Sequence, residues 1–96
     1  MSQLKKAREI IDQIDQEMAE LFCRRMIASR SIAEYKKEHG LPIDDFGREG
    51  EIIARNSERI ASDDYRSYYV DFLKSTIDIS KNYVFFCKFS KQLLFF

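Results

Sequence analysis

The segment from Leu4 to Glu38 contains no proline or glycine and carries apolar residues at helical spacing throughout. We therefore expect one continuous helix here. At about 1.5 Å per residue it would be roughly 50 Å long, whereas a compact chain of this size has a diameter of only about 35 Å. The predicted helix thus extends beyond the fold of its own chain, and much of it needs a second chain to cover it.

Two heptad positions along this helix form a continuous apolar seam. Its side chains are those of Leu4, Ala7, Ile11, Ile14, Met18, Leu21, Ala28, Ile32 and Tyr35. Arg25 interrupts the seam at a position where the pattern asks for Leu or Ile. Since so small a chain buries little of its surface when folded alone, we expect an intertwined homodimer in which the long helices pack along each other.

Two more helices are predicted after this one. Gly40 and Pro42 should end the first helix, and Asp45 is a good N-cap for a second, from about Phe46 to Ile60. Its buried side would be formed by Ile52, Ile53 and Ile60.

Ser62 should cap the third helix, which is again long. Its apolar stripe consists of Tyr65, Tyr69, Phe72, Thr76, Ile79, Tyr83 and Phe86. No alternating strand pattern is present, so the fold class is all-α, with a long, a short and a long helix in a single domain over residues 1–96. The segment 84–96 is an atypical Phe-rich tail, which we expect to be covered by a partner or loosely packed rather than anchored on a membrane.

Composition excludes several classes of function. Lys and Arg number 16 and are balanced by 16 Asp and Glu, so the basic field needed for nucleic-acid binding is absent. Cys23, Cys87 and His39 lack the spacing of a metal site, and no apolar run approaches the roughly 20 residues of a membrane span. The start of the chain lacks the apolar core of a signal peptide. We expect a cytoplasmic protein with reduced thiols and no bound metal or cofactor.

Arg25 and Lys36 are the first candidate site residues. They are eleven residues apart, which brings them within about 20° of the same helix face and about 16 Å apart along the axis. Two long cationic side chains can close that gap around a small anion with more than one carboxylate. Spacing alone favours the alternative in which Arg25 fixes dimer register and Lys36 is a cation at the helix end.

A second cluster begins the second helix, where Asp45, Arg48 and Glu49 share one face. A short loop separates it from Lys36, so a small polar ligand could sit between the two helices; the alternative is a capping Asp45 in a surface ion pair with Arg48. Arg8 lies seventeen residues from Arg25, about 25 Å along the helix. It could approach the site only from an antiparallel partner helix.

No Ser/His/Asp set, Cys/His pair or phosphate-binding glycine loop is recognisable in the sequence. Nucleophilic, metal-assisted and P-loop chemistry are therefore poorly supported. A reaction that needs only fixed charges fits better.

These residues, in this order, resemble the all-helical (AroQ-type) chorismate mutases. The likeness covers about residues 4–83, and its matching stretches are Ala7–Asp15, Arg24-Arg25 ahead of Ile32–Lys36, Gly40–Ile43 and Asp45–Glu49. The resemblance implies an intertwined dimer with two identical sites and no cofactor. It also implies conversion of chorismate to prephenate by a pericyclic Claisen rearrangement, in the biosynthesis of phenylalanine and tyrosine.

The resemblance further implies the role of each residue. Arg25 and Arg8 of the partner subunit would bind the two carboxylates of chorismate, with Arg48 and Ser80 in support. Lys36 would contact a carboxylate and the ether oxygen, while Glu49, with Asp45 beside it, would hold the ring hydroxyl. Lys36, Arg25, Arg48 and Glu49 would be the catalytic residues.

Val84 departs from the family pattern. The family usually places a Gln or Glu one turn after the serine matched by Ser80, where it donates a hydrogen bond to the ether oxygen. Valine cannot donate, and loss of such a donor typically costs about 100- to 1000-fold in rate. A weakened enzyme is therefore one expectation from the sequence.

Two other functions remain open at this point. One is an isochorismate pyruvate lyase-like enzyme on the same scaffold. The other is a non-catalytic dimeric helical module that binds an aromatic-pathway metabolite or a partner protein.

Overall fold

The computed structural model describes residues 2–89, which form three α-helices and no strand. They are α1 (Ser2–Glu38), α2 (Phe46–Ser57) and α3 (Asp63–Phe89). The predicted all-α class and the order long, short, long are confirmed. Residues 90–96, which make up most of the predicted Phe-rich tail, lie outside the described residues.

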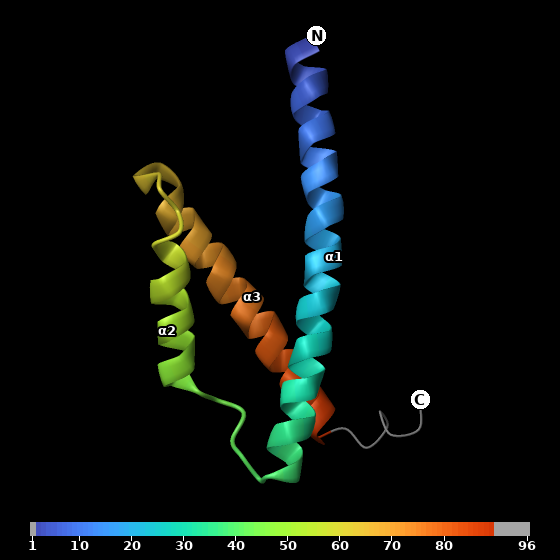
Figure 1. The fold of residues 1–96 in the computed structure, drawn as a ribbon, viewed down its shortest axis with the longest axis vertical. Helices are drawn as coiled ribbons and strands as arrows, with labels where there is room; N and C mark the ends of the chain where they lie inside the picture. The colour runs from blue at the N-terminus through green and yellow to red at the C-terminus, as the bar shows by residue number, and fades with distance from the viewer. Residues whose placement is uncertain (1, 90–96) are drawn as a thin grey trace.

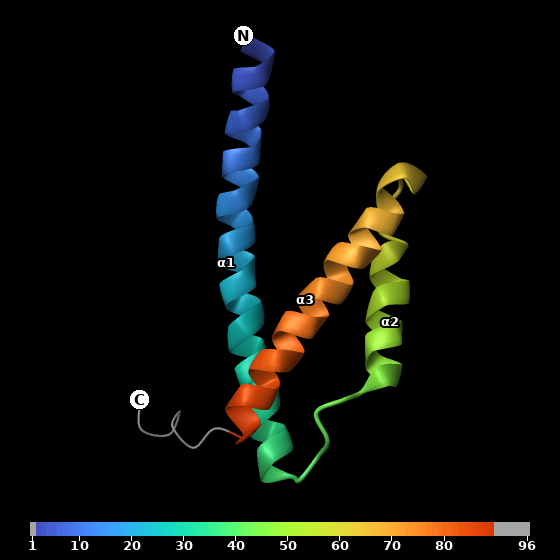
Figure 2. The same cartoon turned by 180° about the vertical axis from the view of Figure 1, so that it is seen from behind.

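Helices α1 and α3 cross near their C-terminal ends, and α2 lies against α3 near the turn that joins α2 to α3 (Figure 1). Helix α2 runs back along the direction of α1, and α3 returns diagonally to cross the C-terminal half of α1 (Figures 1 and 2). The crossing is made possible by small side chains, because Ser29 and Ala33 are the buried residues of α1. The Ser29 hydroxyl donates to the carbonyl oxygen of Arg25 at 2.9 Å, so its burial leaves no polar group unsatisfied.

The predicted end of α1 is confirmed at Gly40. The helix ends at Glu38, Gly40 takes the left-handed conformation with φ 61°, and the Leu41 amide donates to the Lys36 carbonyl at 2.9 Å. This reversal is the usual way in which a glycine stops a helix and satisfies its last carbonyls. It turns the chain sharply toward α2.

The start of α2 is as predicted, but its end is not. Asp45 caps the helix, since its Oδ1 accepts a hydrogen bond from the Arg48 amide at 3.0 Å. The helix ends at Ser57, three residues before the predicted Ile60. The Arg66 guanidinium binds the carbonyl oxygens of Ser57 and Ile60 at 3.3 and 2.8 Å. Because these carbonyl oxygens accept hydrogen bonds from a side chain of α3, they do not require amide donors from a further helical turn. The helix can therefore end before Ile60.

The face of α3 that packs within the chain differs from the predicted stripe. Its buried residues are Leu73, Ile77 and Val84. By contrast, Tyr65, Phe72, Ile79 and Phe86 of the stripe are 48–69% exposed. Apolar side chains occupy more than one face of α3, and periodicity selected the face with more aromatic residues rather than the one that meets α1 and α2.

The apolar seam of α1 is left uncovered in the single chain. In its N-terminal part Leu4, Ile11, Ile14, Met18 and Leu21 are 41–56% exposed. The radius of gyration is 17.0 Å and the extents are 54 × 32 × 13 Å, whereas a compact chain of this length has a radius near 13 Å. The long helix therefore does extend beyond the fold of its own chain, as the sequence predicted.

No helix in the described part of the chain has both the length and the apolar character to cross a membrane.

Candidate active site

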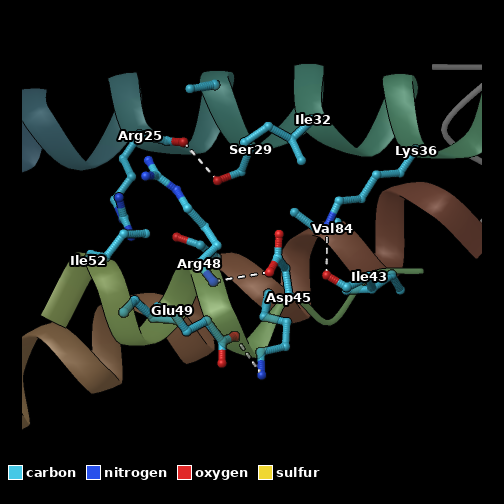
Figure 3. A pocket seen from close by; sticks show the side chains of 14 residues that line it. Arg25, Ser29, Ile32, Lys36, Ile43, Asp45, Arg48, Glu49, Ile52 and Val84 are labelled. Carbon is cyan, nitrogen blue, oxygen red and sulfur yellow. Dashed lines mark hydrogen bonds and ion pairs between the residues drawn. The ribbon is translucent and has the colours of Figure 1, made fainter. Parts of the chain in front are cut away.

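A cavity of about 230 Å³ lies where the C-terminal half of α1, the start of α2 and the C-terminal half of α3 meet (Figure 3). Each helix contributes side chains spaced three, four or seven residues apart, which is the spacing of one helix face. The loop between α1 and α2 contributes Ile43 and Asp45. The lining residues are Arg25, Ala28, Ser29, Ile32, Lys36, Ile43, Asp45, Arg48, Glu49, Ile52, Ile77, Ser80, Lys81 and Val84.

The predicted site residues of a single chain meet in this cavity, with one exception. Those that line it are Arg25, Lys36, Asp45, Arg48, Glu49, Ser80 and Val84. Arg8 does not, because it lies in the N-terminal part of α1, beside a separate hollow that it shares with Leu4, Lys5, Glu9 and Asp12. Within one chain the structure does not bring Arg8 to the site.

Three cations converge on the cavity without a carboxylate partner. Within residues 2–89, no ion pair joins Arg25, Lys36 or Arg48 to an acidic side chain. The Nε atom of Arg25 is buried and has no hydrogen-bond partner among the described residues. Since a buried charged donor without a partner is costly, this arrangement is suited to an anionic ligand that would supply the missing acceptors.

Lys36 and Arg48 reach into the cavity from opposite walls. Figure 3 shows the Arg48 side chain extending from α2 toward α1, between Arg25 and Ser29. The Lys36 ammonium donates to the carbonyl oxygen of Ile43 at 2.7 Å. That contact uses one of its three donors, so Lys36 keeps two for a ligand.

One carboxylate oxygen of Asp45 binds the backbone. Its Oδ1 accepts from the Arg48 amide, as expected of an N-cap, and the surface ion pair with the Arg48 guanidinium that the sequence left open is not found. Its other carboxylate oxygen remains for a ligand hydroxyl.

Glu49 is held by a residue that sequence reasoning missed. The Lys81 ammonium lies 2.8 Å from Glu49 Oε1 and 3.1 Å from Asp44 Oδ1. The pKa of Lys81 is raised because Glu49, and then Asp44, accept hydrogen bonds from the charged ammonium. The only signal in the sequence was its position, one residue after Ser80 and three before Val84, on the face of α3 that lines the cavity.

Ser80 and Val84 give the α3 wall two different characters. The hydroxyl oxygen of Ser80 is buried and has no hydrogen-bond partner within the described residues, so it is available to a ligand. Val84 is only 6% exposed and presents an apolar surface to the same cavity.

The arrangement is suited to binding a ligand rather than to nucleophilic attack on it. It offers three cationic donors, a free hydroxyl and two carboxylates to a small, anionic, hydroxylated ligand. The described residues contain no group of three or more His, Cys, Asp or Glu side chains that could hold a metal ion. A cavity of this kind can fix the conformation of a dianion and stabilise charge that develops on it.

Comparison with known proteins identifies one family. A family model described as chorismate mutase type II matches residues 7–84, a range that contains every lining residue of the cavity and also Arg8. Neither the curated proteins nor the solved structures yielded a match to the chain.

Proposed function

Because the chain belongs to the chorismate mutase type II family, we propose that it catalyses the rearrangement of chorismate to prephenate, in the biosynthesis of phenylalanine and tyrosine. The observation that carries the proposal is the set of three cations, Arg25, Lys36 and Arg48, which face one small cavity without a carboxylate partner within residues 2–89. Chorismate is a dianion of the size such a cavity admits.

The reaction asks for the groups that the cavity offers. In a Claisen rearrangement the ether C–O bond breaks while a C–C bond forms within the same molecule, so no base or nucleophile is required. The enzyme must hold the flexible substrate in a compact conformation and stabilise the charge that grows on the ether oxygen. We assign the carboxylates to Arg25, Arg48 and Ser80, and the ether oxygen to Lys36.

The ring hydroxyl of the substrate would be held by carboxylates. Glu49 supports this assignment because Lys81 binds its Oε1 and leaves Oε2 for a donor. Asp45 likewise keeps one oxygen beyond its helix cap. Asp45 caps α2 and Glu49 lies in its first turn, four residues later, so both side chains line the same cavity.

We propose further that the site is completed by a second copy of the chain. An apolar groove of about 360 Å³ separates α1 from α3 and is lined by Met18, Leu21, Phe22, Arg25, Phe72, Thr76 and Ile79. It holds residues of the exposed seam of α1 and of the exposed stripe of α3. Arg25 lines both this groove and the candidate active site, so a partner helix seated in the groove would lie beside the substrate.

An antiparallel α1 in that groove would bring Arg8 of the partner subunit toward Arg25. This would add a fourth cation for the second carboxylate of chorismate. It would also explain why Arg8, which lies within the range matched by the family model, is about 25 Å along the helix from Arg25 of its own chain.

Sedimentation tests the dimer. The purified chain at micromolar concentration should have about twice the 11.4 kDa mass of one chain, because the seam is too apolar to remain in water. A folded monomer at this concentration would contradict the intertwined arrangement and, with it, the assignment of Arg8.

A non-catalytic binding module remains a second candidate because of Val84. It is buried at the wall of the cavity where the family usually has a hydrogen-bond donor. A site that keeps its cations but lacks this donor would still bind chorismate without converting it efficiently.

Product analysis distinguishes these functions. The chain is incubated with chorismate and, separately, with isochorismate, and the products are separated by chromatography. A mutase forms prephenate, and a lyase-like enzyme releases pyruvate from isochorismate. A binding module consumes neither, but its melting temperature rises with chorismate. If neither turnover nor a rise in melting temperature is seen, the proposed function is wrong.

A further inference from the structure

Lys81 connects the elements that form the candidate active site. It lies on α3, and its ammonium reaches Glu49 on α2 and Asp44 in the loop between α1 and α2, at 2.8 and 3.1 Å. The ammonium also lies 5.4 Å from the centre of the Phe46 ring, at the start of α2. One side chain thus fixes both the position of α2 against α3 and the direction of the Glu49 side chain.

The direction of Glu49 matters because of its neighbours. It follows Arg48 directly in the chain and lines the same cavity as Arg25 and Lys36. A carboxylate that lines one cavity with three cations would gain by pairing with one of them, since charge-assisted hydrogen bonds are the strong ones. Instead, Figure 3 shows the Glu49 carboxylate pointing away from α1, while Arg48 points toward it.

Lys81 has little left to offer a substrate. An ammonium has three donors, and here two of them meet carboxylates. The two carboxylates outweigh the one ammonium and leave this cluster with a net negative charge, so the direct attraction of Lys81 for an anion is weak. What the geometry supports is an action through Glu49.

We propose that Lys81 is a positioning residue that holds the Glu49 carboxylate and prevents it from pairing with Arg25 and Arg48. Those arginines are thereby left free for the carboxylates of the substrate, and Oε2 of Glu49 is left free for the ring hydroxyl. The inference rests on the proposed function, because it assigns the arginines to a dianionic substrate.

Four proteins test the inference: the parent, Lys81→Met, Glu49→Gln and the double variant. In Lys81→Met the released Glu49 competes with substrate for the arginines, so KM for chorismate should rise about ten-fold, more than kcat falls. In the Glu49→Gln background the competing charge is gone. The same Lys81→Met change should then alter KM by less than about two-fold.

Two further variants distinguish a positioning role of Lys81 from a purely structural one. Lys81→Arg keeps the charge, so its KM for chorismate should be close to that of the parent. Lys74→Met removes an exposed lysine from the same helix and should leave KM unchanged. Melting temperatures of the parent, Lys81→Met, Glu49→Gln and the double variant are measured without substrate. The changes in the two single variants should not add up to the change in the double variant, because Lys81 and Glu49 interact directly.

The outcomes separate the two proposals. If the parent converts chorismate and Lys81→Met raises KM equally in both backgrounds, Lys81 does not act through Glu49 and the inference is wrong. It is equally wrong if Lys74→Met raises KM as much as Lys81→Met does. If the parent neither converts nor binds chorismate, the proposed function fails and the substrate role of Lys81 fails with it, whatever the melting temperatures show.

Discussion

Replacing Arg25 by alanine should lower kcat/KM for chorismate by at least about 100-fold. The guanidinium faces the cavity with a buried Nε that has no hydrogen-bond partner among the described residues. A hydrogen bond between charged groups contributes about 1.5–3 kcal/mol, so losing a two-pronged contact to a carboxylate costs 100-fold or more. Steady-state kinetics measures the loss, and far-ultraviolet circular dichroism should show that the helices remain.

Arg24→Ala is the matched control, because Arg24 is the neighbouring residue on α1 and is exposed. It should behave like the parent. Arg48→Ala should resemble Arg25→Ala in activity without disturbing the start of α2, since the cap of that helix uses the Arg48 backbone amide. If Arg25→Ala changes the sedimentation but not the activity of the remaining dimers, Arg25 sets dimer register and the pocket is elsewhere.

Replacing Val84 by glutamine should raise kcat ten-fold or more while KM changes little. Val84 lies at the wall of the cavity one turn after Ser80, where an amide could donate to the ether oxygen as its charge develops. A hydrogen bond made mainly in the transition state lowers the barrier without tightening substrate binding. Kinetics and thermal unfolding should be measured on the same preparation.

Val84→Met is the control for size, because methionine resembles glutamine in shape but has no donor. It should give no gain in rate. The burial of Val84 provides the opposing argument: a buried glutamine without a partner would cost about 1–3 kcal/mol of stability. A less stable Val84→Gln variant with no gain in kcat would show that Val84 only packs against its neighbours.

Local signals in the sequence were sufficient for the three helices, the end of α1 and the start of α2. Gly40 stops α1 and Asp45 caps α2 through contacts within five residues, so no tertiary information was needed. The common face of Arg25 and Lys36, and that of Asp45, Arg48 and Glu49, followed from helical geometry alone. These are the parts of the candidate site that the sequence could supply.

Features that depend on packing between distant segments could not be predicted. The end of α2 is set by Arg66, which lies beyond the helix and reaches back to its carbonyls. Lys81 pairs with Asp44 and Glu49, more than thirty residues earlier. The buried face of α3 depends on where Ser29 and Ala33 let it cross α1. Periodicity reports how apolar a face is, but not which surface covers it.

In the proposed dimer, two chains together form a site that converts chorismate, with Arg25 from one chain and Arg8 of the partner subunit. A mixing experiment tests it most directly. Arg8→Ala and Arg25→Ala chains are each refolded alone and then refolded together in equal amounts, and prephenate formation is measured in all three samples.

Each variant alone should be nearly inactive, since both sites of each dimer lack one arginine. The mixture should recover about one quarter of the parent activity, because half of the dimers are mixed and a two-fold axis leaves each of these with one intact site. A mixture no more active than its components, or an Arg8→Ala chain as active as the parent, would contradict the shared site.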